Sequence, residues 1–105
     1  MNLNAFTEKA QEALVAAPRL ATSLAHAQVE PEHLLVTLGE QPGGIVPALF
    51  QKLGQPAAPI ALALKDQLSR LPKAHGGAEP GLSARLRAVL EQAQAEATAM
   101  QDQFV

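Results

Sequence analysis

Two stretches decide the fold of this chain: TEKAQEALVAAPRLATSL at residues 7–24 and SARLRAVLEQAQAEATAM at residues 83–100. Each begins with a hydroxyl residue, Thr7 or Ser83, that can cap a helix by accepting a hydrogen bond from a first-turn amide. Behind each cap, apolar residues recur at steps of three and four, which is the spacing of one buried helical face. Pro18 interrupts the first pattern, so a kink there and a break into two helices are both compatible with the sequence.

The two stretches are related by an internal repeat, because they align without a gap when 76 is added to each residue number of the first. The matched positions are Thr7 with Ser83, Lys9 with Arg85, Leu14 with Leu90, Ala17 with Ala93, Ala21 with Ala97, Leu24 with Met100 and Val29 with Val105. A matched cap followed by a matched stripe fixes where each helix starts and which face it buries. We therefore expect residues 1–72 to form a first repeat, 73–82 a loop, and 83–105 the first half of a second repeat. On this interpretation the domain is incomplete.

Three further helices are predicted between the two long ones. Pro31 suits the first position of a short helix, and Gly54 suits the C-terminal cap of a helix over residues 45–53. Pro59 opens the next helix and Pro72 stops it. No alternating apolar run predicts a strand. The expected fold is all-α, a bundle of about five helices with a pseudo-twofold relation between the repeats.

Composition excludes several classes of protein. The chain has 105 residues and a mass of 11.0 kDa, the size of one small domain. It has no cysteine, which excludes disulfides, thiolate catalysis and zinc fingers and favours a cytoplasmic location. A net charge of −2 does not favour nucleic acid as a partner. The start lacks the pattern of a signal peptide, and no apolar run approaches the roughly 20 residues that span a bilayer, so no membrane association is expected.

Residues that could carry chemistry do not form a catalytic or metal-binding pattern. The His-Glu-x-x-His spacing of zinc hydrolases is absent among His26, Glu30, Glu32 and His33. Pro31 should start a new helix between them, so we do not expect them to share one face. We expect His33 to act as a cap or in a buried hydrogen bond. No phosphate-binding loop and no nucleophile elbow occur, so this chain is not expected to bind ATP or to be an enzyme by itself.

Four sequence elements point to a known family: the opening Met-Asn-Leu-x-x-x-Thr7-x-Lys9, the element Glu32-His33-Leu34-Leu35, Leu71-Pro72-Lys73 with its glycine-containing loop, and Asp102-x-Phe104-Val105. Together they resemble the Clp amino-terminal domain over essentially the whole chain. The start and the Leu-Pro-Lys loop are more similar to the ClpB disaggregase branch than to the protease-partner branches. The family domain is longer and has two complete repeats.

The resemblance implies an accessory domain of a hexameric AAA+ chaperone. Such a domain engages exposed segments of unfolded or aggregated proteins and helps deliver them to the central pore of the hexamer. The parent would bind ATP in its other modules and collaborate with the DnaK, DnaJ and GrpE system. Two alternatives remain open: an adaptor-binding domain of a protease-associated unfoldase, and a free-standing helical dimerisation module.

The resemblance also supplies candidate substrate-binding residues. It ties Thr7 and Asp102 to substrate handling, against the simpler interpretation that Thr7 caps a helix and Asp102 ends one. Leu86, Leu90 and Phe104 are candidates for an apolar surface that catches unfolded chains, although residues at helical spacing more often form core. If the long helices pack antiparallel, Thr7 should lie near Asp102 and Ser83 near His26.

Overall fold

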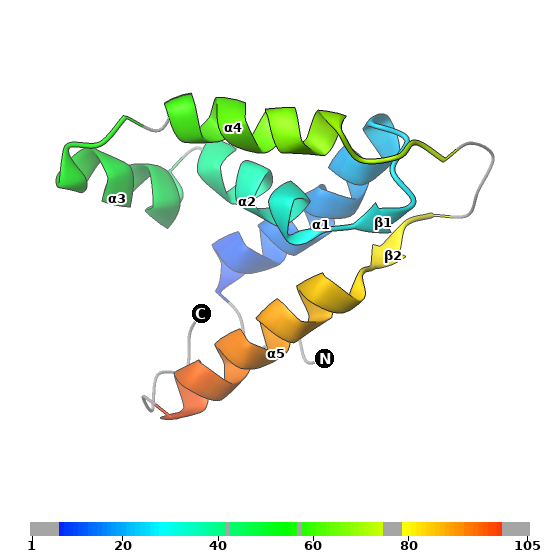
Figure 1. Cartoon of the computed structure of the whole chain (residues 1–105). Helices are drawn as coiled ribbons and strands as arrows, with labels where there is room; N and C mark the ends of the chain where they lie inside the picture. The colour runs from blue at the N-terminus through cyan, green and yellow to red at the C-terminus, as the bar shows by residue number, and fades with distance from the viewer. Residues whose placement is uncertain (1–6, 42, 57, 75–78, 100–105) are drawn as a thin grey trace.

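The computed structural model describes residues 7–41, 43–56, 58–74 and 79–99. In chain order its elements are α1 (Glu8–Ser23), β1 (Gln28–Val29), α2 (Pro31–Glu40), α3 (Ile45–Leu53), α4 (Ala58–Ser69), β2 (Gly81–Leu82) and α5 (Ala84–Ala99) (Figure 1). The all-α prediction and its five helices are confirmed. The expectation of no strand is wrong in one detail, because β1 and β2 pair in parallel. Strands of two residues are too short to leave an alternating pattern in the sequence.

Helix α1 is one continuous helix of 16 residues with Pro18 inside it, so the structure excludes a break there. The predicted cap is present: the Ala10 amide donates to Thr7 Oγ1 at 3.1 Å. The buried face of α1 consists of alanines only, at positions 13, 17 and 21. Small side chains on this face allow neighbouring helices to approach α1 closely.

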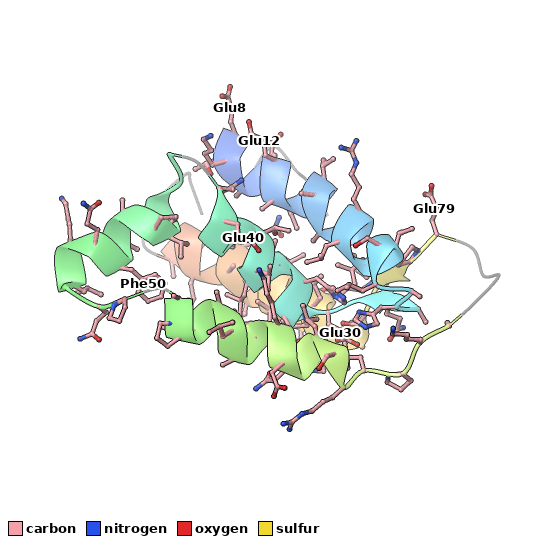
Figure 2. The ribbon with its side chains drawn as sticks, turned by 90° about the horizontal axis from the view of Figure 1, so that it is seen from above. Glu8, Glu12, Glu30, Glu40, Phe50 and Glu79 are labelled. Carbon is pink, nitrogen blue, oxygen red and sulfur yellow. The ribbon has the colours of Figure 1, made fainter. Side chains whose placement is uncertain are left out.

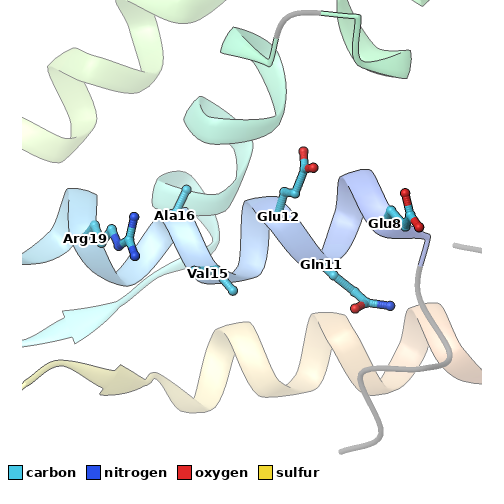
Figure 3. Close-up of a pocket in the computed structure, with 6 residues that line it drawn as sticks. All are labelled: Glu8, Gln11, Glu12, Val15, Ala16 and Arg19. Carbon is cyan, nitrogen blue, oxygen red and sulfur yellow. The ribbon is translucent and has the colours of Figure 1, made fainter.

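Helix α5 runs antiparallel to α1, as the predicted pseudo-twofold requires (Figures 1 and 3). Its predicted cap is also present, with the Leu86 amide donating to Ser83 Oγ at 3.0 Å. The Ser83 amide donates to the Val29 carbonyl at 3.0 Å, which joins the start of α5 to β1. Val89 is half-exposed, although it follows the three-and-four apolar spacing of this helix together with Leu86 and Leu90.

Helix α2 lies at the centre of the fold, in contact with α1, α3, α4 and α5. It begins at Pro31, as predicted. Helix α3 ends at Gly54, whose φ of 68° is the left-handed conformation expected of a glycine cap. Helix α4 begins at Ala58, one residue before the predicted Pro59, and buries Leu68. One core joins α1, β1, α2 and α5 through Ala13, Ala17, Ala21, Val29, Leu34, Leu86 and Leu90.

Candidate functional site

A shallow hollow follows the exposed side of α1. It has a volume of about 530 Å³. Its lining residues are Glu8, Gln11, Glu12, Val15, Ala16 and Arg19 (Figure 3). In that view Gln11 and Val15 lie on the side of α1 that faces α5, and Glu12 and Ala16 lie on the opposite side. The apolar centre of the hollow is Val15, whose exposed fraction is 54%. Acidic residues lie toward its N-terminal end, and Arg19 lies at the other.

A second hollow of about 390 Å³ continues from the first toward the C-terminal end of α1. Its lining residues are Val15, Pro18, Arg19, Thr22, Glu79 and Pro80. Figure 2 shows Glu79 on the segment that returns past this end of α1. Because Val15 and Arg19 line both hollows, the two form one surface, which we call the α1 surface. It combines an exposed apolar side chain with charged side chains at its edges.

The structure describes three of the five predicted substrate-binding residues, namely Thr7, Leu86 and Leu90. Thr7 is half-buried and directly precedes Glu8, the first residue that lines the α1 surface. Asp102 and Phe104 lie outside the described residues, so the expected proximity of Thr7 and Asp102 is not addressed. Leu86 and Leu90 have exposed fractions of 0% and 4% and belong to the core. The core role that their helical spacing favours is therefore confirmed, and neither leucine offers exposed apolar surface. The alanine face of α1 leaves room for these two leucines, and α5 places them there.

Sequence reasoning missed Val15 because it concentrated on the buried stripe. Ala13 and Ala17 belong to that stripe, and Val15 lies between them on another face of the same helix. A β-branched apolar residue surrounded by Glu12, Ala16 and Arg19 is the signal that could have identified an exposed apolar position.

A buried polar cluster lies at the start of α2, about His33. The Glu30 amide donates to His33 Nδ1 at 2.8 Å, so the predicted capping role of His33 is confirmed. The other ring nitrogen, Nε2, lies 2.8 Å from His26 Nδ1. The side chain of His33 has no exposed surface, and His26 is also buried. Burial lowers the pKa of His33, and the neighbouring His26 lowers it further, against the opposing effect of the Glu30 and Glu32 carboxylates.

Arg85 connects this cluster to α5. Its guanidinium lies 3.4 Å from Glu30 Oε1 and 3.1 Å from Glu32 Oε2. Both carboxylates are mostly buried, whereas Arg85 is largely exposed. Burial by itself would raise the pKa of Glu32, but the backbone amide of Glu32 and the Arg85 guanidinium outweigh it and hold that pKa below its ordinary value. We call His26, Glu30, Glu32, His33 and Arg85 the α2 junction.

The antiparallel pair of capped helices, with Glu-His-Leu-Leu at the start of α2, defines an all-helical repeat domain of the Clp type. The chain belongs to the Clp repeat (R) N-terminal domain family, whose profile matches residues 5–105. This confirms the resemblance drawn from the four sequence elements. Among the described residues, no helix is both long and apolar enough to cross a membrane.

Similar proteins place the chain near the ClpB branch. It is 40% identical to the chaperone protein ClpB of Nitratidesulfovibrio vulgaris, over all of this chain and 13% of that protein. It is 38% identical to ClpB of Bacteroides thetaiotaomicron, over all of this chain and 12% of that protein. The chain thus spans about an eighth of the length of these relatives. The solved N-terminal domain of the ClpV1 ATPase from E. coli EAEC is 28% identical with a TM-score of 0.87, covering 95% of this chain and 61% of that one.

Proposed function

We propose that this chain is an accessory substrate-engaging domain of a ClpB-like, ATP-dependent disaggregase. It binds exposed segments of unfolded or aggregated proteins through the α1 surface and helps deliver them to the pore of the parent hexamer. The observation that carries this proposal is the half-exposed Val15 between two continuous hollows on a helix whose other exposed positions are mostly polar. Membership of the family and the similarity to ClpB chaperones support it.

The geometry of the α1 surface suits a transient contact with many clients. Burial of apolar side chains is non-directional and so does not require one client sequence. A shallow surface buries little area, and ordering a flexible client opposes binding, so the affinity is weak. Weak affinity is appropriate for a domain that must pass its client onward. Thr7 fixes the backbone at the N-terminal end of this surface, and we include Thr7 and Asp102 among the proposed client contacts.

The remaining parts of the proposal concern the parent protein. Its other modules bind and hydrolyse ATP, and this chain itself carries out no covalent chemistry. The parent works in the cytoplasm with the DnaK, DnaJ and GrpE system. These statements rest on the similarity to ClpB, of which this chain spans only a small part.

The proposal is tested by binding of a fluorophore-labelled, permanently unfolded protein to the variant Val15→Ser. Valine and serine have similar helix propensities, so α1 should remain folded. Loss of the apolar contact should weaken binding about threefold to fivefold. The matched control is Leu62→Ser, which removes an exposed apolar side chain from α4, away from the α1 surface. Equal affinity of wild type and Val15→Ser, with both folded by circular dichroism, would contradict the proposal.

A second candidate function is docking of one dedicated partner protein, as in an adaptor-binding domain of another Clp unfoldase. The 28% identity to the ClpV1 domain over most of this chain favours it. The two functions differ in selectivity. Unfolded proteins of unrelated sequence should compete with one another for a general client-binding surface, whereas a dedicated docking site should discriminate strongly among them.

A further inference from the structure

Two buried histidines join the end of α1 to the start of α2. His26 follows the turn after α1, where Ala25 has a left-handed φ of 59° and the His26 amide donates to the Ala21 carbonyl at 2.9 Å. His33 lies in the first turn of α2. The ring nitrogens of the two residues are 2.8 Å apart, and the ring centroids are 5.0 Å apart. Because both rings are buried, this contact is shielded from water.

The hydrogen bonds assign the protonation of both rings. The Glu30 amide is a donor, so His33 Nδ1 must present its lone pair to it. A neutral His33 then carries its proton on Nε2 and donates it to His26 Nδ1. His26 Nδ1 is therefore the acceptor, and His26 carries its own proton on Nε2. One donor–acceptor chain thus runs from Glu30 through His33 to His26, and it requires both imidazoles to be neutral.

One added proton cannot be accommodated without breaking this chain. If the proton goes to His33 Nδ1, it faces the Glu30 amide, which is also a donor. If it goes to His26 Nδ1, it faces the proton on His33 Nε2. In either case one of the two hydrogen bonds becomes a contact between two donors. Two donors held at this separation in a buried site are strongly unfavourable, so the rings must move apart.

Charged groups from the neighbouring elements act on the pair in opposite directions. Glu30 and Glu32, at the start of α2, favour a proton on His33. Arg85 reaches them from α5 and pairs with both carboxylates, which reduces that effect. Lys73 pairs with His26 through the backbone in an isolated antiparallel bridge. Burial opposes protonation of His33, and the net effect is a pKa of His33 below its ordinary value.

We propose that the His26–His33 pair is a pH-sensitive latch between the end of α1 and the start of α2. When both rings are neutral, the latch fixes the first turn of α2, so that Glu30 and Glu32 hold Arg85. Protonation separates the rings, releases the first turn of α2 and weakens its attachment to α5. Because α5 runs beside the α1 surface, acidification also loosens the helix that borders this surface (Figure 3).

The sign of the pH dependence follows from linkage. The folded state disfavours the proton that an unfolded chain takes up near pH 6.5, the ordinary pKa of histidine. The contribution of neutral His33 to the stability of the folded chain is fully present above this pH. It is lost as the pH falls through the lowered pKa of His33. For each proton that the folded state excludes, the equilibrium constant for unfolding rises by up to about tenfold when the pH is lowered by one unit.

The direct test is nitrogen NMR of the histidine rings of the wild-type chain. At about pH 7.5 we expect unprotonated Nδ1 and protonated Nε2 in both rings. Lowering the pH toward 5 should shift the Glu30 and Leu34 amide signals together with the titration of His33. Protonated Nδ1 on His33 at about pH 7.5, or amide signals that stay fixed while His33 titrates, would overturn the proposal.

Variants provide an independent test by thermal unfolding between about pH 7.5 and 5.5. His33→Gln keeps an acceptor for the Glu30 amide and a donor for His26 but does not titrate. The melting temperature of the wild type should fall as the pH is lowered over this range. The double variant His26→Gln/His33→Gln should therefore show a much smaller fall. His75→Gln removes the third histidine of the chain and should retain that fall. An equal fall in the wild type and the folded double variant would contradict the latch. If the double variant does not fold, the NMR titration of the wild type still decides.

Discussion

At the α2 junction buried polar side chains are bonded to one another and to the exposed Arg85, whereas along α3 and α4 several apolar side chains are exposed. His33 has no exposed surface, while Leu53 and Leu62 have exposed fractions of 69% and 68%. Residues 41–64, which include all of α3 and the first half of α4, contain a single charged residue, Lys52. We call α3 and α4 the arm. The side chains of the junction are held by hydrogen bonds and ion pairs, which are directional and specify one arrangement. The helices of the arm are held by partial apolar burial, which is non-directional and specifies their arrangement weakly.

The largest effect should come from removing the central ring of the junction. His33→Ala deletes a fully buried side chain and leaves the Glu30 amide and His26 Nδ1 without their partner. We expect the free energy of unfolding to fall by about 2–4 kcal/mol near pH 7.5. Chemical denaturation measures it. A loss below about 1 kcal/mol would show that the junction does not carry the stability assigned to it.

A smaller effect should come from Arg85→Gln, which removes the connection from the junction to α5. Arg85 is largely exposed, so solvent screening limits the expected loss to about 0.5–1 kcal/mol near neutral pH. Because the guanidinium helps to lower the pKa of Glu32, this pKa should be higher in the variant than in the wild type. The difference in the free energy of unfolding between wild type and variant should be full above pH 4.5, the ordinary pKa of a glutamate. It should shrink as the pH falls through the lowered pKa of Glu32. A difference that grows below this pH would contradict this explanation.

The smallest effect should come from the arm. Leu53→Ser removes a mostly exposed side chain at the end of α3, so the free energy of unfolding should change by less than about 0.5 kcal/mol. The same denaturation experiment measures it beside His33→Ala. If Leu53→Ser were as destabilising as His33→Ala, the contrast between junction and arm would be wrong.

Much of the fold was predictable because its signals are local. The Thr7 and Ser83 caps, the Pro31 start and the Gly54 end all involve residues within one helical turn of one another. These signals, together with the repeat, also led to the correct family.

The features that sequence reasoning missed depend on contacts between distant segments. The pairing of β1 with β2 joins residues 28–29 to 81–82 and leaves no periodic pattern in either strand. The contact of His26 with His33 depends on the left-handed turn at Ala25, which no local signal marks. On α5 the three-and-four pattern showed that the helix has an apolar face. It could not show that the alanines of α1 would cover Leu86 and Leu90 and leave Val89 half-exposed.

The comparison between regions also bears on client binding, because the arm exposes more apolar surface than α1 does. Exposure by itself would favour Leu53 and Leu62 as contacts for an unfolded protein. The α1 surface offers an apolar centre within continuous hollows and with charged edges. We therefore expect clients to prefer α1.

The most direct measurement is a map of amide NMR shifts of the wild-type chain titrated with an unlabelled, permanently unfolded protein. The shifts should cluster on α1 around Val15 and extend to the segment at Glu79 and Pro80, with little change along α3 and α4. Shifts concentrated on the exposed leucines of the arm, with α1 unaffected, would contradict the claim that the α1 surface receives clients.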